Sequence, residues 1–140
     1  MSADTPILTV ATEHAPRPAG HYVQAVTYGD LIFVSGQLPI PASGPHLEAN
    51  APFESQAEQA LMNVLNILAA AGAGPADVLK LSAYIVGAGN WPQFNQVCMR
   101  LFGANRSARV VIPVAELHYG YLVEVDAIAR RPRQPLDSRT

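Results

Sequence analysis

The order of the expected secondary-structure elements predicts an α+β fold, in which two helices cover one face of a single mixed sheet. Two amphipathic segments with helical periodicity are interspersed among six β-rich runs in a chain of 140 residues. Apolar residues make up 49% of the chain and charged residues only 14%, which is enough to build one hydrophobic core but too little chain for two domains. We therefore expect a single domain over residues 1–140.

Three strands are expected before the first helix. A short edge strand near Ile7–Val10 is followed by a proline-containing loop. The runs 22–26 and 31–34 flank a Tyr-Gly-Asp turn at 28–30 and together suit a hairpin. The hairpin ends in Ser-Gly-Gln at 35–37, where the glycine either forms a bulge or lets a ligand or another backbone approach closely.

The first helix is expected over residues 53–71, because apolar side chains recur there at spacings of three and four. Pro52 suits a first helical turn and Gly72 supplies the end of the helix. Asn63 and Asn66 are assigned to the solvent side of this helix. One face of the helix should therefore lie on the sheet.

The next unit predicts a strand over Val78–Val86 and then a second helix. Asn90 is a plausible N-cap, and Gly103 ends the helix. Its apolar stripe consists of Phe94, Val97, Cys98, Leu101 and Phe102.

Residues 107–130 carry the chemistry of the chain. Arg109 precedes an apolar run, so its guanidinium must extend to solvent or be held by an anion. The last run alternates with period two and places Glu124 and Asp126 on one face. Arg109 is either a ligand-binding arginine or a partner of one of these carboxylates in a cross-strand ion pair. Pro113 removes a ladder donor and indicates an edge or a bulge.

The two helices leave one sheet face without cover. Val23, Phe33, Val34, Val110 and Ile112 cannot all lie beneath two helices. Self-association through the open face is the physical way to bury them. A homo-oligomer is therefore expected.

Composition argues against several other classes of protein. A net charge of −2 gives no field that would attract nucleic acid, and no apolar run approaches the roughly 20 residues that cross a bilayer. The four histidines lack metal-site spacing, and the single Cys98 has no partner for a disulfide. We expect a cytoplasmic protein that uses no metal or organic cofactor and does not act on membranes.

Five motifs in this sequence resemble the Rid family, the YjgF-type group of reactive-intermediate imine deaminases. They are GHYVQAV at 20–26, VSGQ at 34–37, ALMNVL at 60–65, SAR at 107–109 and VEVDAIA at 123–129. They follow the family's order over about residues 20–131, which the resemblance makes the core of the domain.

The resemblance implies a trimer of chorismate-mutase-like subunits, with a central barrel and active sites between neighbouring subunits. It also implies hydrolysis of enamine and imine intermediates, such as 2-aminoacrylate and 2-iminopropanoate, to a keto acid and ammonia without a cofactor. Arg109 matches the family arginine that holds the substrate carboxylate, and Glu124 the glutamate that assists the attacking water. Tyr22, Ser35 and Gly36 match residues that line the same cleft.

Departures from the family pattern leave the substrate open. His21 and Ser107 replace common prolines, and Val111 replaces a frequent thiol. The bulky residues His118, Tyr119 and Tyr121 occupy a segment where small or charged residues are common, and they narrow or extend the pocket. Two other functions remain open: a non-catalytic trimer that binds a small carboxylate or keto acid, and a ribonuclease.

Overall fold

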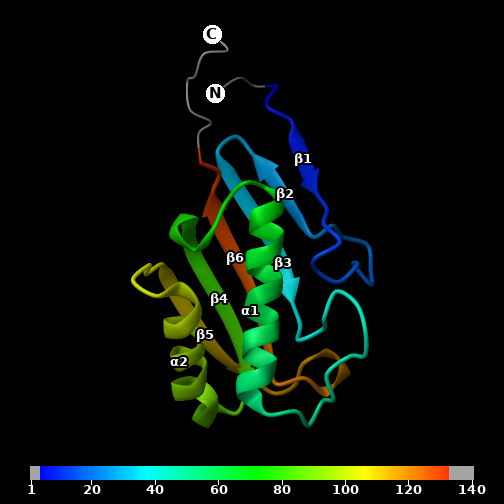
Figure 1. Cartoon of the computed structure of the whole chain (residues 1–140), viewed down its shortest axis with the longest axis vertical. Helices are drawn as coiled ribbons and strands as arrows, with labels where there is room; N and C mark the ends of the chain where they lie inside the picture. Colours follow the sequence, from blue (N-terminus) through cyan, green and yellow to red (C-terminus); the bar gives the residue numbers. More distant parts are fainter. Residues whose placement is uncertain (1–3, 133–140) are drawn as a thin grey trace.

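The computed structural model describes residues 4–132, which form one sheet with both α-helices against the same face (Figure 1). The strands are β1 (Ile7–Val10), β2 (Ala25–Tyr28), β3 (Leu31–Gln37), β4 (Val78–Val86), β5 (Ala108–Val114) and β6 (Val123–Arg130). The helices are α1 (Phe53–Ala70) and α2 (Trp91–Phe102), with 3-10 turns at Pro75–Asp77, Ala88–Asn90 and His118–Gly120. The predicted α+β class, a single sheet with two helices on one face, is confirmed.

The sheet has the strand order β1-β2-β3-β6-β4-β5. All neighbouring strands are antiparallel except β4 and β5, which are parallel, so the sheet is mixed as predicted. A parallel pair needs a crossover connection, and α2 supplies it. β5 is the edge strand beyond β4, which explains how Pro113 is tolerated there.

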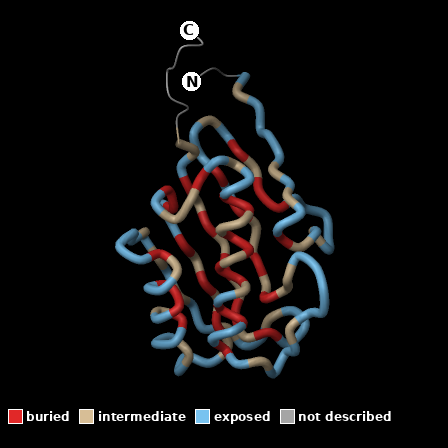
Figure 2. Tube along the Cα trace, viewed as in Figure 1, coloured by how far each residue is buried: buried red, intermediate tan, exposed pale blue. Residues whose placement is uncertain are grey.

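The hydrophobic core lies between the helices and the sheet (Figure 2). The apolar stripe predicted for α1 consists of Phe53, Ala57, Ala60, Leu61, Val64, Leu68 and Ala71. All of these residues are buried except Ala71, which follows the helix and is half-buried. In α2 the predicted stripe is buried apart from Leu101, which is also half-buried. The spacing of apolar residues thus located both helices and the faces they bury.

The hairpin begins later than its sequence predicts. β2 starts at Ala25, and Tyr28 pairs with Leu31 across a two-residue turn in which Gly29 has a φ of 59°. Gln24 is the last residue of the preceding loop. Its buried side-chain amide forms hydrogen bonds with the backbone of the N-terminal segment. The prediction of a strand over 22–26 is therefore wrong for residues 22–24.

The assignment of Asn63 to the solvent side is wrong. Its side chain is fully buried, and its Nδ2 donates to the carbonyl oxygens of Leu38 at 3.1 Å and Ile40 at 2.8 Å. Asn66, one turn later, is half-buried and donates to the carbonyl of His14. A polar residue on a helix flank suggests exposure, but the loop after β3 folds over Asn63 and supplies part-buried carbonyl acceptors.

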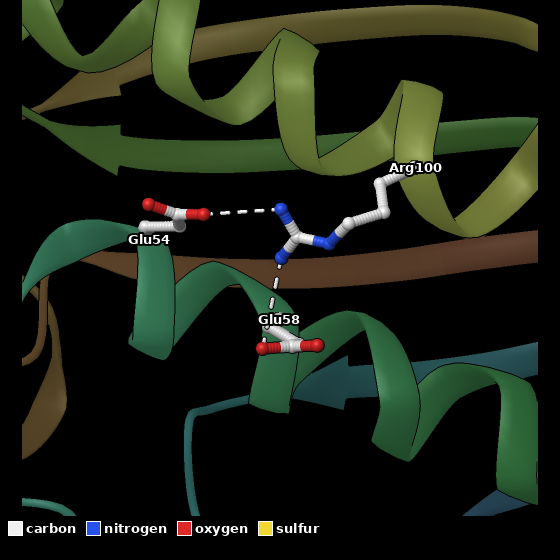
Figure 3. A network of polar contacts seen from close by, with 3 residues as sticks. All are labelled: Glu54, Glu58 and Arg100. Atoms are coloured by element: carbon white, nitrogen blue, oxygen red, sulfur yellow. Dashed lines mark hydrogen bonds and ion pairs between the residues drawn. The ribbon is translucent and has the colours of Figure 1, made fainter.

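An exposed arginine joins the two helices (Figure 3). Arg100 of α2 contacts Glu54 at 3.0 Å and Glu58 at 3.6 Å, both on α1. Because all three side chains are about half exposed, solvent screens the pairs and their contribution to stability is small, under about 1 kcal/mol each. The helix–helix contact therefore depends mainly on apolar packing.

The other face of the sheet is open, as predicted. Phe33, Val110 and Ile112 are 38%, 38% and 40% exposed. Val34 was wrongly included in this set, since it is buried beneath the helices, and Val23 is 37% exposed but lies outside the strands. Within residues 4–132, no helix is both long and apolar enough to cross a membrane.

We expect Asn63→Ala to lower the free energy of unfolding by about 1 to 3 kcal/mol, because two part-buried carbonyl groups lose their donor and the buried amide leaves a gap. Asn66→Ala is the matched control, since it makes the same substitution in the same helix and removes one bond from a half-buried residue. Chemical denaturation of both variants at equal protein concentration measures the difference. Equal destabilisation by the two substitutions would contradict the role assigned to Asn63.

Candidate functional site

Glu124 lies on the open face of the sheet, where the two-residue period of β6 directs it. Opposite it, β3 changes register between Val34 and Gln37, so the irregularity expected at the Ser-Gly-Gln segment is present. A Cβ on Gly36 would overlap the Glu124 carboxylate and approach its Cδ to 3.1 Å. Glycine at position 36 therefore makes room for the carboxylate of Glu124.

A cavity of about 90 Å³ surrounds this carboxylate. Tyr22, Gly36, His118, Tyr119 and Glu124 line it, and we call these five residues the glutamate half-site. The apolar residues Leu38 and Ile40 form part of the cavity wall, and Arg17 also lines the cavity. The structure therefore brings together three residues that the family resemblance implied: Tyr22, Gly36 and Glu124.

Ser35 has a different position from the one expected. Its hydroxyl donates to the carbonyl oxygen of Val23 at 2.6 Å, and its backbone N–H donates to the carbonyl of Gln24. It does not line the cavity around Glu124. Ser35 instead fixes the segment that carries Tyr22.

The electrostatic setting of Glu124 disfavours its charged form. Burial raises the pKa of Glu124 above the ordinary glutamate value, and the nearby Asp126 carboxylate raises it further, while His118 acts in the opposite direction. Asp126 itself accepts a hydrogen bond from the Tyr84 hydroxyl at 3.1 Å. Glu124 is therefore a carboxylate whose basicity is increased by its surroundings.

The segment before β6 contributes two of its three bulky residues to the glutamate half-site. His118 and Tyr119 line the cavity, with ring centroids 3.9 Å apart. Tyr121 does not line it, because its side chain is buried and its hydroxyl donates to the carbonyl of Leu47 at 2.8 Å. The expectation that all three shape the pocket is thus wrong for Tyr121, which anchors the segment.

Arg109 lies on the opposite side of the sheet. It pairs in register with the buried Leu81 of β4, so its side chain projects toward the helices, where its Nη1 donates to Oδ1 of Asn95 at 2.9 Å. Its guanidinium carbon lies 5.2 Å from the centroid of the Trp91 ring, within cation–π range. We call Arg109, Asn95 and Trp91 the arginine half-site.

Arg109, Asn95 and Cys98 line a cavity of about 710 Å³, and Arg106 adds a second cation to it. Burial raises the pKa of the Cys98 thiol, whereas the neighbouring Arg109 lowers it. The thiol therefore favours its neutral form, as the sequence indicated for a core cysteine.

The two half-sites do not meet within one chain. Tyr84 of β4 pairs with Glu124 on one side and with the exposed Ile112 on the other, so this row of residues faces the open side. Arg109 is three residues before Ile112, so it points to the opposite face, and β4 separates its strand from β6. The alternative of a cross-strand ion pair between Arg109 and Glu124 or Asp126 is therefore wrong.

Asn95 and Trp91 contact Arg109 and are candidate site residues that the sequence alone did not indicate. They are four residues apart on α2 and therefore share one helix face. One feature of the sequence could have indicated them. A polar and an aromatic residue share one face of the helix that precedes the strand of Arg109. Among the described residues, no group of three or more His, Cys, Asp or Glu side chains is placed to hold a metal ion.

Comparison with known proteins identifies the family. Residues 12–131 match the family described as Endoribonuclease L-PSP. The chain is 36% identical over 121 residues to a RutC family protein of Pyrococcus horikoshii, covering 86% of this chain and 94% of that protein. It is also 36% identical over 127 residues to the 2-iminobutanoate/2-iminopropanoate deaminase of Escherichia coli, covering 88% and 97%.

A solved structure shows the same fold. Escherichia coli TdcF with bound serine superposes with a TM-score of 0.82 at 31% identity, covering 89% of this chain and 98% of that one. Residues 12–131, which match the family, contain both half-sites. The chain therefore belongs to the Endoribonuclease L-PSP family, the group of the YjgF, RidA and RutC proteins that its sequence motifs resemble.

Proposed function

We propose that this protein hydrolyses 2-imino acids and their enamine tautomers, of the 2-aminoacrylate and 2-iminopropanoate type, to a 2-keto acid and ammonia. The observation that carries the proposal is a pair of groups of opposite charge, Arg109 and Glu124, neither of which forms an ion pair with a described residue. Within residues 4–132, Arg109 has no carboxylate partner and the Glu124 carboxylate has no hydrogen-bond donor. A relative at 36% identity is named as a deaminase of this kind.

Arg109 is suited to hold the substrate carboxylate. Asn95 accepts a hydrogen bond from one end of its guanidinium and Trp91 packs near its face, so the group is oriented before a ligand arrives. A planar guanidinium binds two carboxylate oxygens together, which a lysine does not. The relative TdcF was solved with serine, a small molecule that carries such a carboxylate.

Glu124 is suited to activate the water. The water oxygen bonds to the imine carbon as one water proton passes to Glu124, and the electron pair of the C=N bond moves to nitrogen, which takes up a proton to give a carbinolamine. The C–N bond then breaks as the nitrogen takes up a second proton and leaves as ammonia, and loss of the hydroxyl proton gives the keto group. The two protons that water loses balance the two that nitrogen gains. Fixing the carboxylate near an oriented water supplies the positioning that this addition needs.

The two half-sites are complementary only if they come from different copies of the chain. Arg109 and Glu124 face opposite sides of the sheet, whereas the open face exposes apolar side chains that a second copy would cover. We propose a homotrimer in which the arginine half-site of one subunit meets the glutamate half-site of its neighbour. Each chain then contributes to two active sites.

We expect a particle of about three times the 14.9 kDa chain mass. Size-exclusion chromatography with light scattering at micromolar concentration measures it. Ile112→Asp, which places a charge on the exposed face of β5, should shift the mass toward the monomer and abolish turnover, while Arg100→Ala on the outer helix surface should change neither. A stable monomer of wild-type protein would refute the shared site.

We expect the wild-type protein to accelerate pyruvate release from 2-aminoacrylate generated by a dehydratase acting on serine. Glu124→Gln should lower the accelerated rate about 10²- to 10⁴-fold, the usual contribution of a general base. Asp126→Asn is the matched control, since it alters a carboxylate two residues away on the same face and should have a much smaller effect. An unchanged rate in Glu124→Gln would refute the role of Glu124.

We expect pyruvate to change the fluorescence of Trp91, the single tryptophan of the chain, because the bound carboxylate lies beside the Arg109 guanidinium. Arg109→Ala should abolish the change and Arg109→Lys should restore little of it, whereas Glu124→Gln should retain it. A titration monitored by emission, with a calorimetric binding curve as control, tests this. Binding by wild type without any turnover would favour the non-catalytic carboxylate-binding function instead.

A further inference from the structure

The turn before β6 contains an unfavourable backbone conformation. Tyr119 has φ 60° and ψ 13°, and among residues 4–132 no other residue except glycine has a positive φ. Such a conformation is unfavourable for a residue that carries a side chain, and it persists where surrounding contacts determine it. Here the Tyr119 ring packs against His118 at 3.9 Å and edge-on to the buried Tyr121 at 6.3 Å.

This turn places His118 at the cavity that surrounds Glu124. His118 lines the same 90 Å³ cavity as Glu124, and its charge acts on that carboxylate. Within the described residues, neither ring nitrogen of His118 has a hydrogen-bond partner, and the neighbouring Tyr119 ring lies against the imidazole at an interplanar angle of 48°. An imidazole with free nitrogens at the same cavity as a carboxylate is equipped to exchange protons with a ligand.

We propose that His118 is a second catalytic residue, which donates the proton that lets the substrate nitrogen leave as ammonia. This inference rests on the proposed imine hydrolysis and assigns a step that Glu124 alone performs poorly. Glu124 takes a proton from the attacking water, so a separate acid allows nitrogen to be protonated without waiting for that proton to move across the substrate. Histidine is the side chain best suited to this exchange near neutral pH.

The proton balance of the step is complete. Water adds to the protonated imine, one water proton passes to Glu124, and a neutral carbinolamine forms. Protonated His118 gives its proton to the amino nitrogen, the C–N bond breaks with its electron pair on nitrogen, and ammonia leaves. The protonated carbonyl that remains returns a proton to neutral His118, and Glu124 releases its own proton to ammonia or solvent.

Other groups at the cavity set the charge around His118. Arg17, Tyr22 and Glu124 line it with His118 and Tyr119, and Asp126 follows on the same face of β6. Glu48 lies near Tyr121, behind the turn.

His118→Phe tests the proposal, because phenylalanine keeps a ring against Tyr119 but has no nitrogen. We expect kcat for 2-iminopropanoate hydrolysis to fall about 10²-fold with little change in KM, and the loss of activity on the alkaline side of the wild-type pH profile to disappear. His118→Gln keeps a hydrogen-bonding group but does not titrate, and its kcat should fall by a similar factor. His46→Phe changes an exposed histidine outside both half-sites, and its kcat, KM and pH profile should match those of the wild type.

The outcomes separate this inference from the proposed function. Pyruvate-induced Trp91 fluorescence and the particle mass show that each variant is folded and assembled. If His118→Phe retains wild-type kcat and pH profile while His118→Ala loses activity, the ring serves only as a wall and the proton-donor role is overturned. If wild type hydrolyses no imine, the proposed function fails and the role of His118 fails with it.

Discussion

The alternation of side chains along β-strands is the constraint on which the site depends. β4 lies between β5 and β6, and each row of paired residues across these strands points to one face. Arg109 and Glu124 belong to rows of opposite orientation. A shift of one residue in either strand would reverse its row, so the register that buries Val123 and Val125 also determines which face each charged group occupies.

The two faces of the sheet consequently carry different groups. The covered face buries the core and carries Arg109, which α2 orients through Asn95 and Trp91. The open face carries Glu124 together with apolar residues that remain partly exposed in one chain. Our proposal of a shared site follows from this division, since the proposed reaction needs both Arg109 and Glu124 and the two lie on different faces.

Buried amides connect the core to the glutamate half-site. Asn63 of α1 binds the carbonyls of Leu38 and Ile40, two residues that form the apolar wall around Glu124. Gln56, also on α1, donates to two carbonyls of the loop that precedes the helix and accepts from the backbone just before β6. Loops lacking regular structure thus obtain hydrogen-bond partners from a helix that packs on the sheet, which fixes the cavity walls without strands.

The sequence by itself determined the elements and the family. Apolar spacing located α1, α2 and β4, alternation placed Glu124 and Asp126 on one face, and five motifs identified the relatives, because these features depend only on neighbours along the chain. Only the tertiary structure decided the arrangement: it put Arg109 and Glu124 on opposite faces, buried Asn63 and gave Ser35 a supporting hydrogen bond. Such contacts join residues far apart in the chain, and no local periodicity encodes them.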